Sequence, residues 1–372
     1  MKNNNEPIYV TRPNLPPLEK LQPYLEEIWK NKILTNNGPF HQKFEKALAE
    51  YLEVEYINLF TNATIALVVG LQALRITGEV ITTPFSFVAT THALKWNGIT
   101  PVFCDIEEAT LNIDPDKIEA LITPKTTAIM PVHVYGHPCD TDKIQAIADK
   151  YGLKVIYDAA HAFGIKMHNK NLMLEGDMSV LSFHGTKLFS TFEGGAVITK
   201  DEKLKQRIDY LKNFGFADEL TIIAPGINGK MNEFQSVIGL LSLDIVEEEI
   251  AKRKIVAETY FELLSGLKGI RVFDEFNGYK YNYAYFPILT NENEFGASRE
   301  KVYDELKKNN IYARRYFYPL ISNMPSYRTL PSANKDNLPV ANRIAEQVLC
   351  LPIYGKLALK NAIEITNILR NL

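Results

Sequence analysis

The chain has few cysteines, no excess of basic charge and no common nucleotide-binding or hydrolase motif. Its 372 residues contain three cysteines, Cys104, Cys139 and Cys350, an odd number too widely spaced for CxxC, so neither a disulfide framework nor a cysteine-built zinc site is indicated. The 41 basic and 44 acidic residues give a net charge of −3, which argues against electrostatic capture of nucleic acid. GxGxxG, GxxxxGK[ST], HExxH and GxSxG are all missing.

The sequence also lacks the signals of secretion and membrane insertion. The amino terminus MKNNNEPIYV has no apolar stretch of the kind found in signal peptides. No uncharged stretch approaches the roughly 18 residues that a membrane helix needs. We therefore expect a cytoplasmic protein with free thiols and no membrane partner.

Between residues 56 and 199, short β-branched runs alternate with helix-sized segments. This alternation is typical of βαβ units, in which helices cover both faces of a mostly parallel sheet. The sequence therefore predicts an α/β body of three layers, α/β/α. The expected strands are YINLF, EVITT, PVFCDI, TAIMPVH, KVIYD, SVLSFH and GAVIT.

Beyond about residue 232 the pattern changes to a long charged helical stretch, 232–267, which we expect to link the body to a smaller α+β domain. The length of the chain also favours two domains. We assign the large domain, with an amino-terminal arm, to 1–240, and the linking helix with the small domain to 241–372. The small domain is expected to contain strands in 270–273 and 283–289, a helix in 298–310, a loop over 316–338 and a final helix.

Three places carry residues suited to chemistry. The first is the expected helix start at Ala63 and Thr64, where unpaired backbone amides and the helix dipole favour an anion such as phosphate. Alternatively, this segment is an ordinary helix cap. The second is Asp158, which ends an apolar strand at the edge where ligands of parallel sheets bind. Its carboxylate suits a metal, a ribose or a protonated ring nitrogen, or else caps the next turn.

The third place is Ser182 to Lys187, followed by the glycine pair Gly194 and Gly195. A lysine set among small and aromatic neighbours can be buried, which lowers its pKa and makes the amine a nucleophile for carbonyls. A surface lysine is the alternative. The glycine pair permits a close backbone approach or a tight turn.

The three places together match the needs of pyridoxal phosphate: a phosphate anchor, a partner for the pyridine nitrogen and a Schiff-base lysine. Phe87 follows another strand end and offers an aromatic ring to stack on the pyridine. The sequence therefore favours a pyridoxal phosphate enzyme.

At these residues the chain resembles the DegT-type sugar aminotransferases, which have the aspartate aminotransferase fold (fold type I). The resemblance implies Lys187 as the cofactor-binding lysine and Asp158 as partner of the pyridine nitrogen. It also implies cofactor contacts through Ala63, Thr64, Phe87, His161 and Ser182, and a homodimer in which Asn228 reaches the phosphate of the neighbouring subunit. The matching segments are LTNNGP, TNATIAL, TPFSFVATTHA, PVHVYG, YDAAHAFG, SFHGTK, EGGAVIT, GINGKMNEFQ and CLPIY.

The resemblance further implies transfer of an amino group from L-glutamate, leaving 2-oxoglutarate, to a nucleotide-linked keto sugar. The segments LTNNGPFHQ, ALRITGEVITTPFSFVATTHAL and NFGFADE are similar to members that convert dTDP-4-keto-6-deoxy-D-glucose to the 4-amino sugar (viosamine) for surface polysaccharide such as O-antigen. Members that aminate C3 of a dTDP-3-keto-6-deoxyhexose, or C4 of a GDP- or UDP-linked sugar, share the cofactor motifs and stay open. Position 161 is often Gln in relatives, so whether His161 also titrates is open too.

Candidates for binding the sugar nucleotide are weaker. Arg suits bidentate contacts with a pyrophosphate and aromatic rings can stack on a base, although surface ion pairs are an equal alternative for the two arginines. The candidates are Asn36, Asn37, Arg314, Arg315 and Tyr318.

Three other classes of protein fit the sequence less well. A sugar dehydratase of this fold carries His at the position of Lys187, and a regulatory protein would show a helix-turn-helix or a basic face, neither of which is seen. A metal hydrolase built on PVHVYGHPCD would use His133, His137, Cys139 and Asp140, but a turn separates the two histidines, so their spacing does not aim both at one ion. We expect no bound metal.

Overall fold

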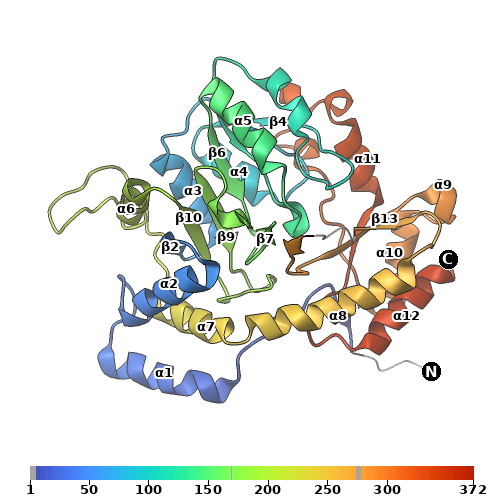
Figure 1. Ribbon diagram of the computed structural model, residues 1–372, viewed down its shortest axis with the longest axis horizontal. Helices are drawn as coiled ribbons and strands as arrows, with labels where there is room; N and C mark the ends of the chain where they lie inside the picture. Colours follow the sequence, from blue (N-terminus) through green and yellow to red (C-terminus); the bar gives the residue numbers. More distant parts are fainter. Residues whose placement is uncertain (1–5, 169, 274–277) are drawn as a thin grey trace.

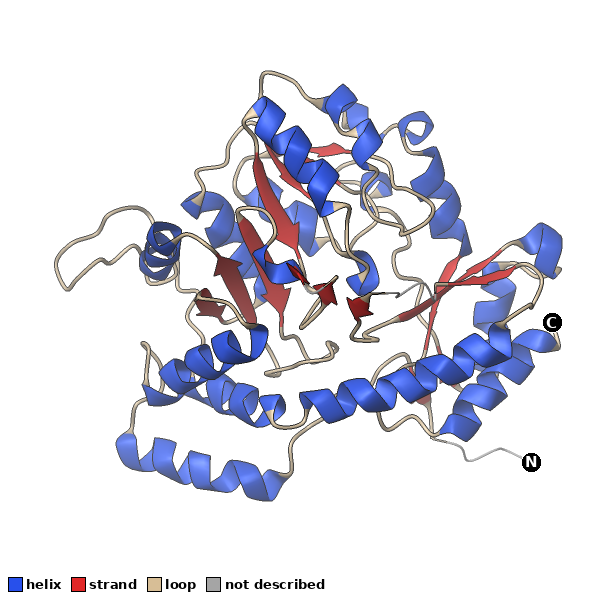
Figure 2. Ribbon diagram, viewed as in Figure 1, coloured by secondary structure: helices blue, strands red, loops and turns tan. Residues whose placement is uncertain are grey.

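A seven-stranded sheet forms the centre of the computed structural model, which describes residues 6–168, 170–273 and 278–372. β10 runs antiparallel to both neighbours and every other pair in the sheet is parallel. The predicted mostly parallel sheet is confirmed (Figure 2). In spatial order the strands are β2 (Tyr56–Phe60), β10 (Gly195–Thr199), β9 (Met178–Ser182), β6 (Lys154–Asp158), β5 (Thr126–Met130), β3 (Glu79–Thr82) and β4 (Thr100–Phe103).

Helices cover both faces of this sheet, because successive side chains of each strand point to opposite sides. In β10, Ala196 and Ile198 belong to the apolar cluster that includes Phe44 of α2, whereas Val197 joins the cluster that includes Leu67 of α3. The predicted three layers are therefore present. On one side lie α2 (Pro39–Leu52) and α5 (Thr141–Tyr151), and on the other α3 (Ala63–Ala73), α4 (Ala89–Trp96) and α6 (Glu202–Leu211).

The stretch predicted as one long helix is two helices, α7 (Glu233–Leu243) and α8 (Val246–Leu264). The two helices are separated by Asp244 and Ile245, and the φ of Ile245 is distorted to −119° with ψ −4°. The break has a packing reason. Val237 and Leu241 of α7 are buried in one cluster with residues of α1 (Leu18–Asn31), whereas α8 runs on to the carboxy-terminal region and packs against α12 (Leu359–Arg370) (Figure 1).

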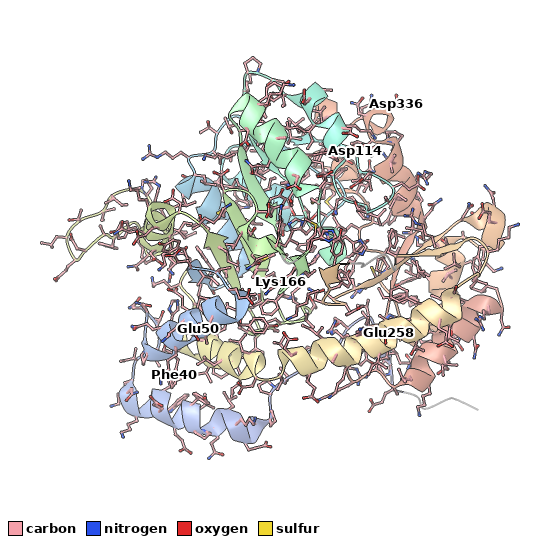
Figure 3. The ribbon with its side chains drawn as sticks, in the orientation of Figure 1. Phe40, Glu50, Asp114, Lys166, Glu258 and Asp336 are labelled. Carbon is pink, nitrogen blue, oxygen red and sulfur yellow. The ribbon has the colours of Figure 1, made fainter. Side chains whose placement is uncertain are left out.

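Large apolar side chains are buried between these helices, and charged side chains lie on the surface. Phe40 is buried against Tyr24 of α1, with ring centroids 5.4 Å apart, while Glu50, Glu258 and Asp336 are exposed (Figure 3). Within the described ranges, no helix is long and apolar enough to cross a membrane.

The carboxy-terminal region holds a three-stranded antiparallel sheet of β11 (Ile270–Val272), β13 (Phe286–Thr290) and β15 (Val348–Leu351). The expected final helix is α12, and two further elements, α11 (Pro339–Gln347) and β15, precede it and were not predicted. The apolar run VLCL of β15 is too short to show the period of a strand, and it lies between two helical patterns. The sequence pattern therefore does not reveal this strand. The remaining elements are α9 (Glu292–Phe295), α10 (Arg299–Lys308), β7 (Lys166–Met167), β8 (Lys170–Asn171) and β12 (Tyr279–Lys280).

The amino-terminal arm reaches the carboxy-terminal region, where β1 (Ile8–Tyr9) pairs in parallel with β14 (Ile311–Tyr312). Residues 1–5 of the amino-terminal stretch lie outside the described residues. The division into 1–240 and 241–372 stays a prediction.

Candidate active site

A cavity of about 250 Å³ lies at the edge of the sheet where β2, β6 and β9 end. These strands run in the same direction, so the residues that follow them meet at that edge. Residues from the carboxy-terminal region close the other side. The lining includes Ala63, Thr64, Phe87, Asp158, His161, Ser182, His184, Lys187, Tyr285, Tyr316 and Phe317.

The amino terminus of α3 forms one end of this cavity. The Asn62 side chain accepts from the amide of Ile65 at 2.9 Å, while the amides of Ala63 and Thr64, as first residues of the helix, have no intrahelical partner. Gly195 lies directly behind this turn, since a Cβ there would come within 2.7 Å of the Ala63 nitrogen. The close backbone approach expected of the glycine pair is therefore present, and it holds an anion-binding terminus against the sheet.

Asp158 is buried at the end of β6 and its carboxylate is held by two donors. The Thr90 hydroxyl donates to Oδ2 at 2.7 Å and the Ala160 amide donates to Oδ1 at 3.1 Å. Burial raises the pKa of Asp158, while both hydrogen bonds and the nearby Lys187 charge oppose that rise. The Ser86 hydroxyl in turn lies 2.9 Å from that of Thr90, so the carboxylate has a fixed orientation.

Lys187 projects its amine into the same cavity. Its Nζ donates to the Tyr285 hydroxyl at 3.0 Å. Burial lowers the pKa of the amine to about 8, against the opposing effect of the Asp158 charge. The surface alternative for Lys187 is therefore wrong, and its amine is partly deprotonated near neutral pH, as a nucleophile requires.

His161 is buried as a neutral ring. The Tyr135 amide donates to its Nδ1 at 3.1 Å, so the ring proton lies on Nε2. Burial and the Lys187 charge hold its pKa well below the ordinary range. The ring lies parallel to that of Phe317, with centroids 5.8 Å apart. These contacts favour a hydrogen-bonding role for His161, which stays a prediction.

The other sequence-predicted cofactor residues divide into two groups. Ser182 and Phe87 line the cavity, although 59% of Phe87 remains exposed. Asn228 is exposed on the segment between α6 and α7 and is not among the described residues that line the cavity. His184 also lines the cavity, and its Nδ1 lies 2.8 Å from the Thr186 hydroxyl.

The candidate substrate residues do not line this cavity within the described part of the chain. Arg315 pairs with Glu300 and lies 3.6 Å from the ring centroid of Tyr303, which favours the ion-pair alternative. Tyr318 packs under the guanidinium of Arg299 at 4.4 Å. The remaining candidates are Arg314, whose backbone pairs with Cys350, and Asn36 and Asn37, exposed residues with positive φ.

Sequence reasoning missed Tyr285, Tyr316 and Phe317. Tyr285 precedes β13 in a strand-like run, YAYFPIL, that looks the same as core sequence. Tyr316 and Phe317 lie in the loop expected over 316–338, which carried no functional prediction of its own. No local pattern marks any of them, because they reach the cavity only through the packing of the carboxy-terminal region on the large sheet.

The geometry does not support a metal hydrolase at PVHVYGHPCD. The His133 ring stacks on Tyr157 with centroids 4.6 Å apart, and its Nδ1 accepts from the Cys139 amide. His137 Nδ1 lies 3.3 Å from the Thr110 carbonyl oxygen. The part of the chain that the structure describes contains no group of three or more His, Cys, Asp or Glu side chains arranged to hold a metal.

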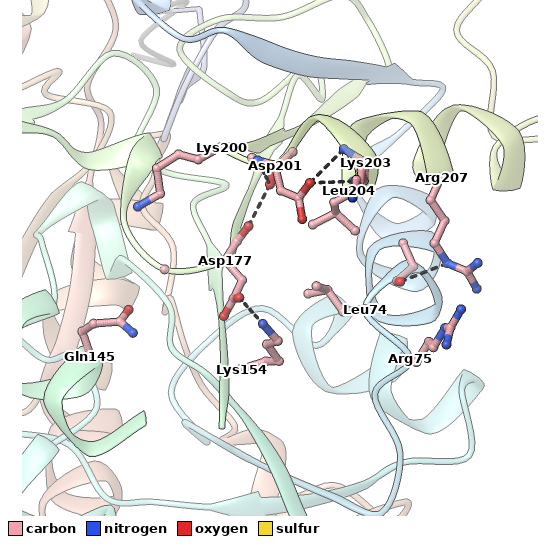
Figure 4. A pocket seen from close by; sticks show the side chains of 13 residues that line it. Leu74, Arg75, Gln145, Lys154, Asp177, Lys200, Asp201, Lys203, Leu204 and Arg207 are labelled. Carbon is pink, nitrogen blue, oxygen red and sulfur yellow. Dashed lines mark hydrogen bonds and ion pairs between the residues drawn. The ribbon is translucent and has the colours of Figure 1, made fainter. Parts of the chain in front are cut away.

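A second, wider cleft of about 600 Å³ lies beside the starts of β6 and β9 and the end of β10, and Figure 4 shows its basic and acidic side chains. Lys154 pairs with Asp177 at 2.6 Å. Asp201 caps α6, and the Arg207 Nε donates to the Ala73 carbonyl. These side chains serve local structure, and none of the predicted site residues lies there.

Comparisons with known proteins agree with this geometry. A family model described as the DegT/DnrJ/EryC1/StrS aminotransferase family matches residues 18–370. The chain is 57% identical to a dTDP-4-amino-4,6-dideoxy-D-glucose transaminase of Escherichia coli, over 98% of this chain and 99% of that protein. A protein of the same name from Shigella dysenteriae is 51% identical, over 95% of each chain.

Among solved structures, DesI in the presence of its TDP-sugar product superimposes with a TM-score of 0.94 at 37% identity, covering 99% of this chain and 93% of that one. The fold is thus that of the pyridoxal phosphate-dependent aminotransferases. By sequence and by fold, the chain belongs to the DegT/DnrJ/EryC1/StrS aminotransferase family and is a pyridoxal phosphate-dependent nucleotide-sugar aminotransferase.

Proposed function

We propose that this enzyme transfers the amino group of L-glutamate to C4 of dTDP-4-keto-6-deoxy-D-glucose, forming dTDP-4-amino-4,6-dideoxy-D-glucose and 2-oxoglutarate. The observation that carries this proposal is the 57% identity, over nearly the whole of both chains, to a transaminase named for that product. The 51% identical relative carries the same name. The product would serve a surface polysaccharide such as an O-antigen.

The residues of the cavity fit pyridoxal phosphate, which supplies a carbonyl carbon and an electron-withdrawing ring when bound. The amides of Ala63 and Thr64, with the Ser182 hydroxyl, form an end suited to its phosphate. The buried carboxylate of Asp158 and the amine of Lys187 line the same space. An anion site, a carboxylate and an amine of lowered pKa are the donor set that this cofactor requires.

Within that set each side chain has its own task. Asp158, whose charged form accepts hydrogen bonds from Thr90 and Ala160, would pair with the ring nitrogen and favour its protonated form. Lys187 is the nucleophile and, once free, the general acid and base that moves a proton. The neutral His161 has the proton on Nε2 available for donation, and Phe87 offers a ring at the cavity that could stack on the pyridine.

We further propose a homodimer in which Asn228 completes the site of the neighbouring subunit. The segment around Asn228 carries several apolar side chains that are exposed in the single chain, and contiguous exposed apolar surface typically marks a protein interface. They are Phe214, Phe216, Leu220, Ile222, Ile223 and Ile227. The three free buried cysteines are consistent with the cytoplasm as the place of action.

The alternatives differ in sugar and nucleotide. Amination of C3, or of a GDP- or UDP-linked 4-keto sugar, would use the same cofactor residues. The relatives' names favour C4 and dTDP, and the solved relative, DesI, was crystallised in the presence of its TDP-sugar product. A regulatory role is disfavoured because the nucleophile, its carboxylate partner and the anion site meet in one cavity.

Absorption spectroscopy on one protein sample, with successive additions, tests this proposal. Pyridoxal phosphate added to the protein should produce a visible band, which L-glutamate should bleach and dTDP-4-keto-6-deoxy-D-glucose should restore. The matched control is the GDP-linked 4-keto sugar, which should restore the band far more slowly. Restoration by the GDP-linked sugar alone would transfer the assignment to that substrate.

A further inference from the structure

The Tyr285 hydroxyl meets the one amine on which this chemistry depends. Tyr285 lies immediately before β13, and its Oη accepts a hydrogen bond from Lys187 Nζ at 3.0 Å. The same Nζ lies 5.6 Å from the centre of the Tyr285 ring. This contact is made by the free amine, the form of Lys187 that exists whenever the lysine is not bound to the cofactor.

The position of this hydroxyl is set by aromatic packing and does not depend on Lys187. The Tyr285 ring lies 4.6 Å from the ring of His161, 5.7 Å from that of Tyr135 and 6.0 Å from that of Tyr316. Aromatic side chains have only two rotatable bonds, so three neighbouring rings restrict the hydroxyl closely. A long flexible lysine chain, by contrast, loses much rotamer freedom when its end is held.

The other groups that face Lys187 act on its charge through space. The charges of Asp158 and Tyr316 raise the pKa of the amine and burial lowers it, while His161 is neutral. Among the described residues, Tyr285 is the side chain that hydrogen-bonds the amine. Orientation of the free amine therefore depends on this contact.

We propose that Tyr285 is a positioning residue that receives the Lys187 amine each time it leaves the cofactor and holds it in the cavity for proton transfer and renewed attack. This inference rests on the proposed function. It also gives the carboxy-terminal region a part in the chemistry. Tyr285 reaches the cavity from the residue just before β13, the middle strand of that region's sheet.

Covalent capture of the cofactor by cofactor-free protein isolates this role from turnover. In that step the Lys187 amine adds to the aldehyde of pyridoxal phosphate, a C=N bond forms and one water leaves. The capture rate, followed by visible absorbance from pH 6 to pH 10, should rise with deprotonation of the amine around its pKa of about 8 and then level off. Tyr285→Phe keeps the ring and removes the hydroxyl, and Tyr283→Phe is the matched control, since Tyr283 is not among the described residues lining the cavity.

Tyr285→Phe should lower the plateau rate by about tenfold, the factor that corresponds to about 1.4 kcal/mol. Its midpoint should move to lower pH by about one unit, because the charged amine loses its acceptor. Tyr283→Phe should match the wild type in both respects. Thermal unfolding of the three cofactor-free proteins shows whether the variants fold.

A plateau rate in Tyr285→Phe equal to that of the wild type would overturn the inference, whatever the midpoint does. This failure is distinct from failure of the proposed function. If the wild type itself forms no visible band with pyridoxal phosphate, the cofactor chemistry assigned to Lys187 fails first.

Discussion

Lys187 and Asp158 show how a strongly apolar site keeps reactive groups usable. The amine is partly buried and its pKa falls to about 8, while the carboxylate keeps two hydrogen-bond donors that favour its charged form. Desolvation raises the pKa of a carboxyl group and lowers the pKa of an amine. The result is an amine that loses its proton easily beside a carboxylate fixed in orientation.

Replacing Lys187 by Ala should abolish transamination while the body stays folded, because the nucleophile and proton carrier is one atom, Nζ. Product formation measured by chromatography, together with the thermal unfolding midpoint, checks both halves of this expectation. Lys200→Ala, a change at an exposed lysine, is the matched control and should keep full activity. Retained amino transfer in Lys187→Ala would remove Lys187 from its role.

The lowered pKa of Lys187 also predicts a pH-dependent stability. Between about pH 8 and its ordinary value of 10.5, the unfolded chain binds more protons at this site than the folded chain, so the stability of the cofactor-free protein rises with pH there. Lys187→Met removes that effect. It should stabilise the cofactor-free protein at pH 7 by about 2 kcal/mol, allowing for the partial exposure of Lys187, and the gain should shrink towards pH 10.

Urea unfolding at pH 7 and pH 10 measures this difference directly. A stability gain of Lys187→Met that is equal at both pH values would show that the amine titrates normally in the folded protein.

The candidate site residues that the sequence could predict lie at or just after the end of an expected strand. Asp158, Ser182 and Lys187 could be found because parallel strands deliver the residues after them to one edge. Tyr285 could not, because its place depends on how two distant parts of the chain pack. Arg315 shows the converse: a residue type suited to phosphate recognition is instead paired with Glu300.

The start of α7 is hydrogen-bonded to the end of β2 and to the residues before β10, close to the amino terminus of α3. Asn232 and Gln235 form a capping box. The Gln235 amide also donates to the carbonyl oxygens of Glu193 at 2.6 Å and Thr61 at 3.3 Å. One side chain thereby links the end of β2, the start of β10 and the first turn of α7, which together hold Ala63 in place.

Gln235→Ala should therefore destabilise the protein by about 1–3 kcal/mol, since the Gln235 half of the capping box and two further hydrogen bonds are lost. It should also weaken retention of pyridoxal phosphate, because the α3 terminus is no longer tied to its neighbours. Equilibrium unfolding and dialysis against buffer without cofactor measure the two effects. Gln145→Ala, at a half-buried glutamine bonded to Asp149, should change neither, and unaltered retention in Gln235→Ala would contradict the linking role.

Elements with a clear period were predicted well and those set by partners were not. The strands of the large sheet follow the sequence pattern. The break at Ile245 and the strand β15 do not, because one depends on α7 and α8 packing against different neighbours and the other on pairing with β13.

The apolar segment around Asn228 is the proposed interface of a homodimer, which can be tested in solution. We expect a mass in solution of twice the 42.2 kDa of the chain, measured by light scattering. Ile222→Glu should shift that mass towards the monomer and reduce cofactor retention, because a charge in an apolar interface is desolvated without a partner. Leu359→Glu, at an exposed apolar residue of α12, should stay dimeric, and a monomeric wild type with full activity would contradict the shared site.

The most direct test of the account follows nitrogen from donor to product. The purified enzyme is incubated with pyridoxal phosphate, ¹⁵N-labelled L-glutamate and dTDP-4-keto-6-deoxy-D-glucose, and the product is analysed by NMR. The account predicts one ¹⁵N atom bonded to C4 of a dTDP-linked 4,6-dideoxy sugar, with 2-oxoglutarate formed in equal amount. Label at C3, or no labelled sugar while the GDP-linked 4-keto sugar is aminated, would contradict it.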